Sequence, residues 1–365
     1  MGFKCGIVGL PNVGKSTLFN ALTETAAAEA ANYPFCTIEP NVGRVAVPDE
    51  RLDRIAAIAK SQKILPTQLE FVDIAGLVRG ASKGEGLGNQ FLANIREVDA
   101  IVHVLRCFEG EVTHVEGSVA PLRDAETVEM ELMIADMDSI ERQLDGAAKR
   151  AKIGDKEAQR RLAVLQPVAE ALRAGRPART VQVAADQKPT FDALSLLSAK
   201  PVLYVANVEE AAAATGNALS EQVRLMAEAE GAGFVVISAA IEAEVASLGD
   251  PAEKREYLES LGLRETGLAR LIREGYRLLD LITFFTAGPK ETRAWTVRAG
   301  AKAPEAAGVI HSDFERGFIR AETIAYDDFV ALGGEQAAKD AGRMRAEGKE
   351  YPVKDGDVFH FRFNV

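Results

Sequence analysis

The chain has 365 residues, enough for two or three domains, and its 47% hydrophobic and 27% charged residues are typical of a globular protein. The net charge of −11 argues against non-specific coating of nucleic acid, and no apolar run is long enough to span a membrane. Cys5, Cys36 and Cys107 lie far apart without a CxxC pair, so we expect neither a disulfide framework nor a zinc site. Reduced thiols and a start without signal-peptide features lead us to expect a cytoplasmic protein.

Short apolar runs alternate with helical stretches in residues 1–122 and again in residues 200–280. The runs are rich in Val, Ile and Phe and end in loops, as strands do when both faces of a parallel sheet are covered. The predicted strands are Cys5–Val8, Gln68–Val72, Ile101–Leu105, Val202–Ala206 and Phe234–Ile237. We therefore predict one doubly wound α/β domain from both segments, with its ligands at the carboxyl ends of the strands.

Residues 123–199 interrupt this domain with two segments whose apolar residues recur at spacings of three and four. The apolar positions are Met130, Met133, Met137, Ile140, Leu144, Ala147 and Ala151, then Ala158, Leu162, Leu165, Ala169 and Leu172. Because Gly154-Asp155 lies between them, we predict an antiparallel helical hairpin. Basic residues gather near its turn: Lys149, Arg150, Lys152, Lys156, Arg160 and Arg161. A solvated helix surface explains them as readily as contact with an RNA phosphate backbone, so both interpretations stay open.

Residues 281–365 show a sequence pattern that differs from that of the preceding segments. Ala294–Val297 and Val358–Phe363 are predicted strands, and Asp355-Gly356 before the latter is a turn signal. Ala303–Ile310 is a predicted short helix. The pattern indicates a small mixed α+β module.

The residues that carry the chemistry begin with Gly9-Leu10-Pro11-Asn12-Val13-Gly14-Lys15-Ser16, which fits G-x-x-x-x-G-K-[ST] between a predicted strand and a helical run, Thr17–Leu22. The two glycines allow the backbone N–H groups to form a nest for phosphate, at the positive end of the helix. Lys15 is predicted to reach the β- and γ-phosphates, and the Ser16 hydroxyl to bind Mg²⁺. The predicted nucleotide-binding residues here are Asn12, Val13, Gly14, Lys15, Ser16 and Thr17.

Three residues downstream of this P-loop complete the predicted phosphate site. Asp73 ends an apolar strand, where an acid holds Mg²⁺ through a water, and the Gly76 N–H is placed to meet the γ-phosphate. Thr37 lies in a polar loop between the two phosphate motifs. A lone loop threonine is usually surface, but this placement favours Thr37 as a third Mg²⁺ contact.

The order of these motifs resembles that of translation-factor-type P-loop GTPases of the Obg-related branch. The whole chain resembles more narrowly the Obg-like ATPases of YchF type. The residues that carry the resemblance are Asn32–Asn41 (NYPFCTIEPN), Asp73–Gly80 (DIAGLVRG), Gly84–Asn89 (GEGLGN) and Phe359–Val365 (FHFRFNV). The resemblance implies that residues 123–199 are an inserted coiled-coil hairpin and that residues 281–365 form a TGS domain, a β-grasp module.

The segment predicted to read the base departs from the GTPase pattern. GTPases have N/T-K-x-D after this strand, whereas this chain has Asn207-Val208-Glu209-Glu210, without Lys and with a longer acid. The family resemblance links this change to ATP, with Asn207 and Val208 reading adenine and Glu210 turned away. It also implies that Ser238, Ala239 and Ala240 contact the base through the backbone.

The group that orients the attacking water is less evident. Many relatives have Gln directly after the D-x-x-G motif, but this chain has Leu77, which forms no hydrogen bond through its side chain. The resemblance favours His114, with Lys15, as a catalytic residue, and a solvent-exposed loop histidine is the alternative. Asn12 corresponds to a position that binds K⁺ in related P-loops, so K⁺ joins Mg²⁺ as a predicted cofactor.

Two kinds of function remain in competition. The first is an ATPase switch that acts on the ribosome or ribosomal RNA, and the second is a regulatory protein that uses ATP mainly as a ligand. A conventional GTPase is the third possibility. We expect a monomer with no membrane contact and no specific DNA partner.

Overall fold

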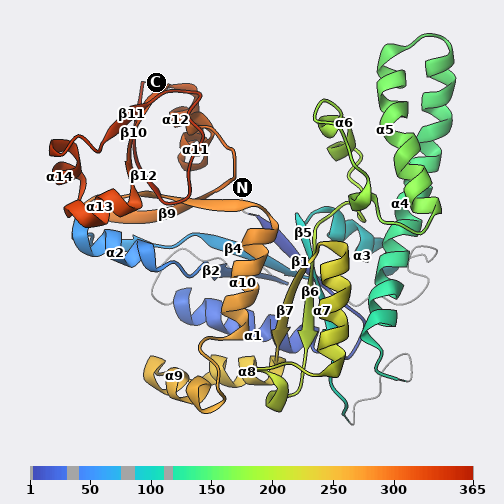
Figure 1. Cartoon of the computed structure of the whole chain (residues 1–365), viewed down its shortest axis with the longest axis horizontal. Coiled ribbons are helices and arrows are strands. Elements are labelled where there is room, and N and C mark those ends of the chain that lie inside the picture. Colours follow the sequence, from blue (N-terminus) through green and yellow to red (C-terminus); the bar gives the residue numbers. More distant parts are fainter. Residues whose placement is uncertain (1–2, 31–40, 75–86, 111–117, 365) are drawn as a thin grey trace.

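The computed structural model describes residues 3–30, 41–74, 87–110 and 118–364 and contains two six-stranded sheets (Figure 1). The strands of the first sheet are β1 (Lys4–Val8), β2 (Val42–Ala46), β4 (Gln68–Asp73), β5 (Ala100–Arg106), β6 (Val202–Asn207) and β7 (Gly233–Ile237). Their order is β2-β4-β1-β5-β6-β7. All five predicted strands are therefore confirmed and pair in parallel. The edge strand β2, which pairs antiparallel with β4, was not predicted.

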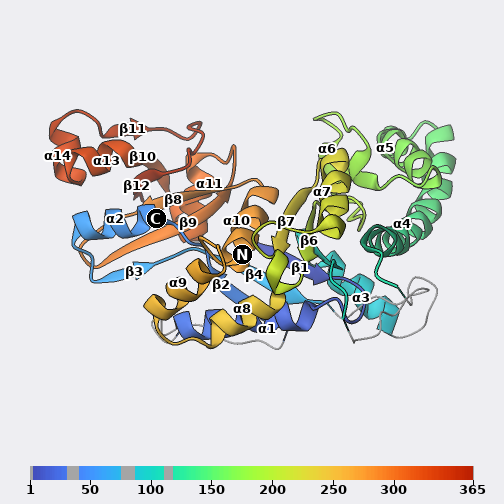
Figure 2. The same cartoon turned by 60° about the horizontal axis from the view of Figure 1, so that its bottom comes forward.

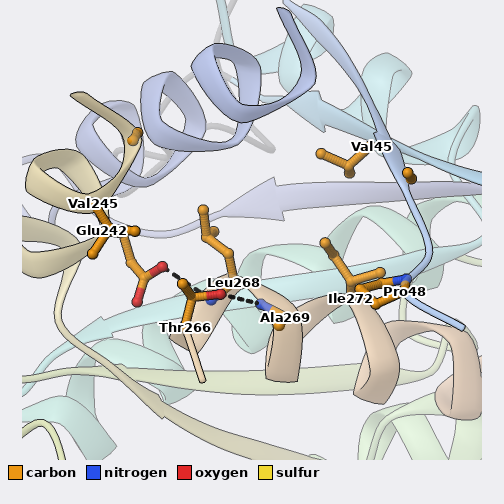
Figure 3. A pocket seen from close by; sticks show the side chains of 10 residues that line it. Val45, Pro48, Glu242, Val245, Thr266, Leu268, Ala269 and Ile272 are labelled. Carbon is orange, nitrogen blue, oxygen red and sulfur yellow. Dashed lines mark hydrogen bonds between the residues drawn. The ribbon is translucent and has the colours of Figure 1, made fainter. Parts of the chain in front are cut away.

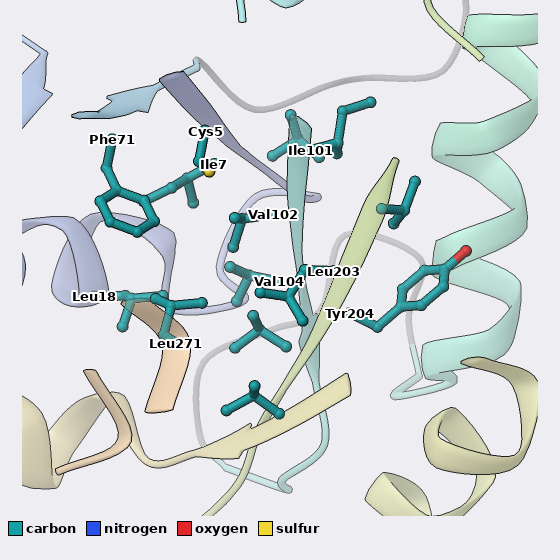
Figure 4. Close-up of a cluster of buried hydrophobic side chains, with 14 of the residues drawn as sticks. Cys5, Ile7, Leu18, Phe71, Ile101, Val102, Val104, Leu203, Tyr204 and Leu271 are labelled. Atoms are coloured by element: carbon teal, nitrogen blue, oxygen red, sulfur yellow. The ribbon is translucent and has the colours of Figure 1, made fainter. Parts of the chain in front are cut away.

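Helices cover both faces of this sheet, as the doubly wound prediction requires. On one face α1 (Lys15–Ala30) packs against β1, β2 and β4, and α10 (Gly267–Leu278) against β5, β6 and β7. On the other face α7 (Ala218–Glu230) lies against β6 and β7. Figure 4 shows the apolar core between these layers. The remaining helical elements of this part are α3 (Leu87–Arg96), η2 (Glu210–Ala212), α8 (Ala239–Ser247) and α9 (Pro251–Ser260).

The predicted antiparallel hairpin is confirmed as α4 (Pro121–Lys152) and α5 (Lys156–Arg173). Asp155 caps α5, because its carboxylate accepts from the N–H groups of Glu157 at 3.0 Å and Ala158 at 3.1 Å. The base of the hairpin is fixed by buried Asp136, which accepts from the N–H groups of Leu197 and Ser198, both at 2.8 Å. The short elements η1 (Ala178–Thr180) and α6 (Lys188–Asp192) follow the hairpin.

The second sheet is mixed and has the order β11-β10-β12-β8-β9-β3. Its strands are β3 (Lys63–Leu65), β8 (Leu281–Thr286), β9 (Glu291–Arg298), β10 (Phe318–Ala325), β11 (Arg345–Glu347) and β12 (Asp357–Phe363). Its helices are α11 (Ala303–Ile310), α12 (Ser312–Arg316), α13 (Tyr326–Leu332) and α14 (Glu335–Asp340). The α+β prediction for this part of the chain is confirmed, and Figures 1 and 2 show the second sheet and the hairpin on opposite sides of the first sheet.

One segment from the first third of the chain packs with this second sheet. After β2, helix α2 (Glu50–Ala59) lies against β9 and α13, and β3 pairs in parallel with β9. Leu52 and Ile55 are buried in the same apolar cluster as Phe285. Sequence patterns had assigned these residues to the nucleotide-binding domain, but their partners lie more than 200 residues later in the chain. No helix among the described residues is both long and apolar enough to cross a membrane.

A buried histidine in the first sheet should make the fold sensitive to acid. His103 on β5 is buried, and its Nε2 atom has no hydrogen-bond partner among the described residues. Burial, with smaller contributions from Arg179 and Lys15, lowers the pKa of His103 to about 3. In the unfolded chain, His103 therefore takes up a proton below about pH 6.5. In the folded chain, the same side chain stays neutral until the pH is far lower.

Lowering the pH from 7 to 5 should thus reduce the free energy of unfolding by about 2 kcal/mol through this one residue. We predict that His103→Leu removes this part of the pH dependence in urea unfolding measured at both pH values. The exposed His360 is the matched control. If the free energy of unfolding falls equally between pH 7 and pH 5 in His103→Leu and in His360→Leu, His103 is not the source of the pH dependence.

Candidate nucleotide-binding site

The predicted P-loop connects the end of β1 to the start of α1. Its backbone takes left-handed φ angles at Asn12 (63°) and Gly14 (95°), and Gly9 has φ 156°. Alternation of this kind turns successive N–H groups toward one side and forms a concave anion site. Because α1 begins at Lys15, its positive end faces the same concavity. The loop therefore has the geometry that phosphate binding requires.

Two of these positions accept only glycine. A Cβ atom on Gly14 would clash with the side-chain nitrogen of Asn207, and one on Gly9 would lie 2.5 Å from the backbone oxygen of Val104. Both glycines are thus required by close approach to neighbouring strands as well as by their φ angles.

Asn207 holds three separate parts of the site together. This residue ends β6 and is only 3% exposed. Its Nδ2 atom donates to the backbone oxygen of Val13 at 2.9 Å, and its Oδ1 atom accepts from the N–H of Ala239 at 2.9 Å. An amide side chain has two N–H groups and two acceptor lone pairs, so one of each remains for a ligand. The side chain thereby joins the P-loop to the first residue of α8.

Lys15, which is buried, and Asp73, which is half-buried, form a pair of opposite charges beside the P-loop. Lys15 opens α1 after the loop that follows β1, and Asp73 ends β4, which pairs with β1 so that Ile7 stands opposite Asp73. Burial lowers the pKa of Lys15 and raises that of Asp73, and their mutual attraction opposes both shifts. A bound triphosphate would place negative charge beside Lys15, and its metal ion would place positive charge beside Asp73.

The donor set fits Mg²⁺. Oδ1 of Asp73 is buried without a hydrogen-bond partner among the described residues. Ser16, the other predicted ligand among the described residues, is exposed in the first turn of α1. Carboxylate and hydroxyl oxygens are the ligands that this cation prefers. The carboxylate oxygen of Asp73 that has no hydrogen-bond partner is therefore available as a metal ligand beside the phosphate-binding loop.

The other predicted site residues differ in what the structure says of them. Asn12 and Thr17 are exposed on the P-loop and on α1, whereas Val13 and Val208 are buried. Ser238, Ala239 and Ala240 lie at the start of α8, close to Asn207 through the bond to Ala239. Thr37, Gly76 and His114 lie outside the described residues. The individual roles of all these residues, including K⁺ binding at Asn12, remain predictions.

Sequence reasoning missed two side chains that organise the neighbouring loops. Arg106 ends β5, is 1% exposed, and donates to the backbone oxygens of Phe108 at 3.1 Å and Gly110 at 3.4 Å. Asn217 donates from Nδ2 to the backbone oxygen of Cys107 at 2.7 Å and to the Glu209 carboxylate at 2.9 Å. A charged residue at the end of a strand rich in Val, Ile and Leu was the available signal for Arg106.

A separate pocket between β2, α8 and α10 does not have the features of a ligand site (Figure 3). Buried Glu242 accepts there from the N–H groups of Gly267 at 2.7 Å and Leu268 at 3.2 Å. Thr266 accepts from Ala269 at 3.0 Å. These bonds cap the first turn of α10, so the polar groups of this pocket serve the fold.

Comparisons with known proteins support the assignment of a nucleotide-binding site. A family model described as a 50S ribosome-binding GTPase matches residues 4–143. The YchF-GTPase C-terminal model, described as a protein of unknown function, matches residues 281–364. The Ribosome-binding ATPase YchF of Haemophilus ducreyi is 58% identical over 366 residues, covering 100% of both chains. The chain belongs to the YchF family.

Further relatives support the same family assignment. The Ribosome-binding ATPase YchF of Bacillus subtilis is 54% identical over 368 residues, again with 100% of each chain covered. The solved structure of the Schizosaccharomyces pombe YchF GTPase is 38% identical, with a TM-score of 0.88 over 99% of this chain and 98% of that one. The predicted family and fold class are confirmed, and the chain is a P-loop nucleotide-binding protein of the YchF family.

The two hydrogen bonds of Asn207 lead to a prediction for nucleotide affinity. In Asn207→Asp the carboxylate still accepts from Ala239, but it has no N–H for the oxygen of Val13 and repels it. The P-loop should shift, and the dissociation constant for a nucleoside triphosphate should rise at least tenfold in fluorescence titration. The exposed Asn20→Asp variant, on α1, is the control. Unchanged affinity in Asn207→Asp would contradict this role.

Proposed function

We propose that the chain is a Mg²⁺-dependent ATPase that works as a nucleotide-controlled switch on the ribosome. The observation that carries the proposal is the pair of buried Lys15 and half-buried Asp73 beside the P-loop nest. Two charged groups held in a site that disfavours both charges indicate a place built for a highly charged ligand. The relatives named as ribosome-binding ATPases support the choice of reaction and partner.

Hydrolysis needs the chain mainly to hold and neutralise the triphosphate. The oxygen of a water bonds to the γ-phosphorus, the bond to the bridging oxygen breaks, and ADP and inorganic phosphate leave. The N–H groups around Gly14 and the positive end of α1 bind the phosphates, and the ammonium of Lys15 stabilises the charge on the β- and γ-oxygens.

Ser16 and Asp73 would hold Mg²⁺, with Thr37 as the third proposed contact. The bound cation neutralises phosphate charge. Since Leu77 offers no hydrogen bond for water, His114 is the residue that we propose to orient it. Turnover that is lost in His114→Ala with ATP affinity intact supports this role, and unchanged turnover excludes it.

The names of the relatives disagree on the nucleotide, because the bacterial proteins are called ATPases and the Schizosaccharomyces pombe protein a GTPase. Two features of this chain favour ATP. Val208, which stands where GTPases have Lys, is 2% exposed. Glu210, which stands where they have Asp, begins η2 on the surface. A carboxylate beside the base suits guanine, which offers it an N–H and an amine. Adenine offers an acceptor at the same place, so a carboxylate that lies on the surface, as that of Glu210 does, is compatible with ATP.

Exchange of this acid should therefore shift the choice of base. We predict that the protein binds ATP at least tenfold more tightly than GTP, and that Glu210→Asp tightens GTP binding about tenfold, equal to about 1.4 kcal/mol. Glu209→Asp is the control, because its parent carboxylate is already held by Asn217. Titration of ATP and GTP into all three proteins measures the effect, and a wild type that prefers GTP would exclude ATP specificity.

Ribosomes should raise turnover if the protein is a switch that acts on them. We predict a several-fold increase of kcat with ribosomes in phosphate-release assays. Turnover that ignores ribosomes, together with nucleotide-dependent binding of other proteins, would favour the alternative, a regulatory protein that uses ATP as a ligand.

The variant Asp73→Asn separates hydrolysis from folding in this assay. It should lose turnover at least a hundredfold, by loss of the metal contact, with and without ribosomes. Its Tm without nucleotide should rise, because the raised pKa of Asp73 means that the folded chain disfavours its ionised form at neutral pH. Exposed Asp53→Asn, on α2, should change neither quantity.

A further inference from the structure

A cavity of about 470 Å³ lies between the first half of α4, helix α7 and residues 175–180, which follow α5. Buried Met133 and Tyr204 line this α4/α7 cavity, and Figure 4 shows the ring of Tyr204 extending from β6 toward α4. Cavities of this size at the junction of two parts of a fold commonly bind ligands. None of the predicted nucleotide-binding residues lines it, so it is separate from the P-loop site.

Methionine side chains give the α4/α7 cavity an apolar and adaptable wall. Met130 from α4 and Met226 from α7 line it together with Met133. Met130 is 51% exposed, and Leu225, which is 53% exposed, lies on α7 one turn before Ala229 of the lining. The apolar surface therefore extends beyond the cavity along α7. A small molecule confined to the cavity would leave this outer surface uncovered, whereas a helix laid across it would cover both.

Acidic groups outnumber cations around the cavity. Its lining contains the carboxylates of Glu126, Glu129 and Glu230 and one cation, Arg179. Arg179 donates to both carboxylate oxygens of Glu129, at 2.8 and 3.1 Å, and to Glu230 at 3.2 Å. The Tyr204 hydroxyl also donates to Glu230, at 2.9 Å. Three ionised carboxylates against one guanidinium leave two negative charges uncompensated.

The surplus of acid is not needed to hold the fold together. Glu129 alone neutralises Arg179 and ties α4 to the segment after α5. Burial raises the pKa of Glu129 despite the attraction of Arg179, and the carboxylate of Glu230 adds to this rise. Both bonds of Glu230 fall on its Oε2 atom, and exposed Glu126 forms no ion pair within the described part of the chain. A cation from outside would relieve the repulsion between these carboxylates.

We propose that the α4/α7 cavity binds a basic amphipathic helix of a partner protein. One apolar side chain of that helix fills the cavity against Met130, Met133 and Met226, and flanking Lys or Arg side chains pair with Glu126 and Glu230. Amphipathic helices commonly bind by placing their apolar face in such a depression, and methionine walls suit this mode because they repack around different side chains. The inference goes beyond the ATPase proposal, since it uses no residue of the nucleotide site.

Fluorescence polarisation with a labelled helical peptide of Leu and Lys, with Leu at every third or fourth position, tests the proposal. The wild type should bind this peptide at least tenfold more tightly than a counterpart with Glu in place of Lys. Glu126→Gln/Glu230→Gln should weaken binding about tenfold and reduce its salt dependence, because salt screens attraction between exposed charges. The amide oxygen introduced by Glu230→Gln can still accept from Tyr204, so the fold should be kept.

Two further variants test the cavity itself. Ala229→Trp places a large ring at the exposed side of the lining without changing the charge, and it should weaken binding at least tenfold. Met130→Ser should weaken binding about threefold with the salt dependence unchanged. ATP turnover should equal that of the wild type in all three variants, and the Tm should not fall.

Matched substitutions elsewhere control for exposed acid and exposed apolar surface in general. Glu253→Gln/Glu256→Gln removes two exposed acids from α9, and Val309→Ser replaces a side chain that is 47% exposed on α11. Neither should change peptide binding.

Equal binding of the basic and the acidic peptide, or wild-type binding by Ala229→Trp, would overturn the proposal. Loss of binding in Glu126→Gln/Glu230→Gln alone would overturn it too, because it would indicate attraction to surface acids without a site. Spermidine that binds as tightly as the peptide would make a small polyamine the occupant instead. Sedimentation of the free wild type as a dimer that Ala229→Trp dissociates would make a second copy of the chain the occupant, and both results would exclude the partner helix.

Discussion

The side-chain amide of Asn207 is the interaction on which the nucleotide site depends. It lies at the end of β6, yet its two hydrogen bonds reach Val13 in the P-loop and Ala239 at the start of α8. The closeness of this amide is also the reason why residue 14 must be glycine. One buried group therefore fixes the distance between the loop that surrounds phosphate and the loop that is proposed to contact the base.

The same site contains charges that the fold by itself does not favour. Burial shifts the pKa values of Lys15 and Asp73 toward their neutral forms, and a carboxylate oxygen of Asp73 has no partner among the described residues. Such groups persist where a ligand completes them. Stability of the empty protein is in this way reduced in favour of nucleotide affinity.

Local pattern was sufficient for some parts of the structure and insufficient for others. The P-loop, the five buried strands and the hairpin were predictable, because each depends on periodicity or on residues within a short stretch of chain. The pairing of β3 with β9 was not, since Lys63 and Glu291 meet through tertiary packing alone. For the same reason, the sequence led to Asn207 as a predicted base contact but could not reveal its hydrogen bond to Val13, 194 residues away.

The most direct test of this account is a crystal structure of the protein with Mg²⁺ and a non-hydrolysable ATP analogue. We predict that the β- and γ-phosphates lie inside the loop Gly9–Ser16, that the ammonium of Lys15 contacts them, and that the metal lies between Ser16 and Asp73. Adenine should lie beside Asn207, and the hydrogen bonds of this amide to Val13 and Ala239 should remain. Phosphates bound elsewhere, or loss of the hydrogen bond between Asn207 and Val13 when the base binds, would contradict this description of the site.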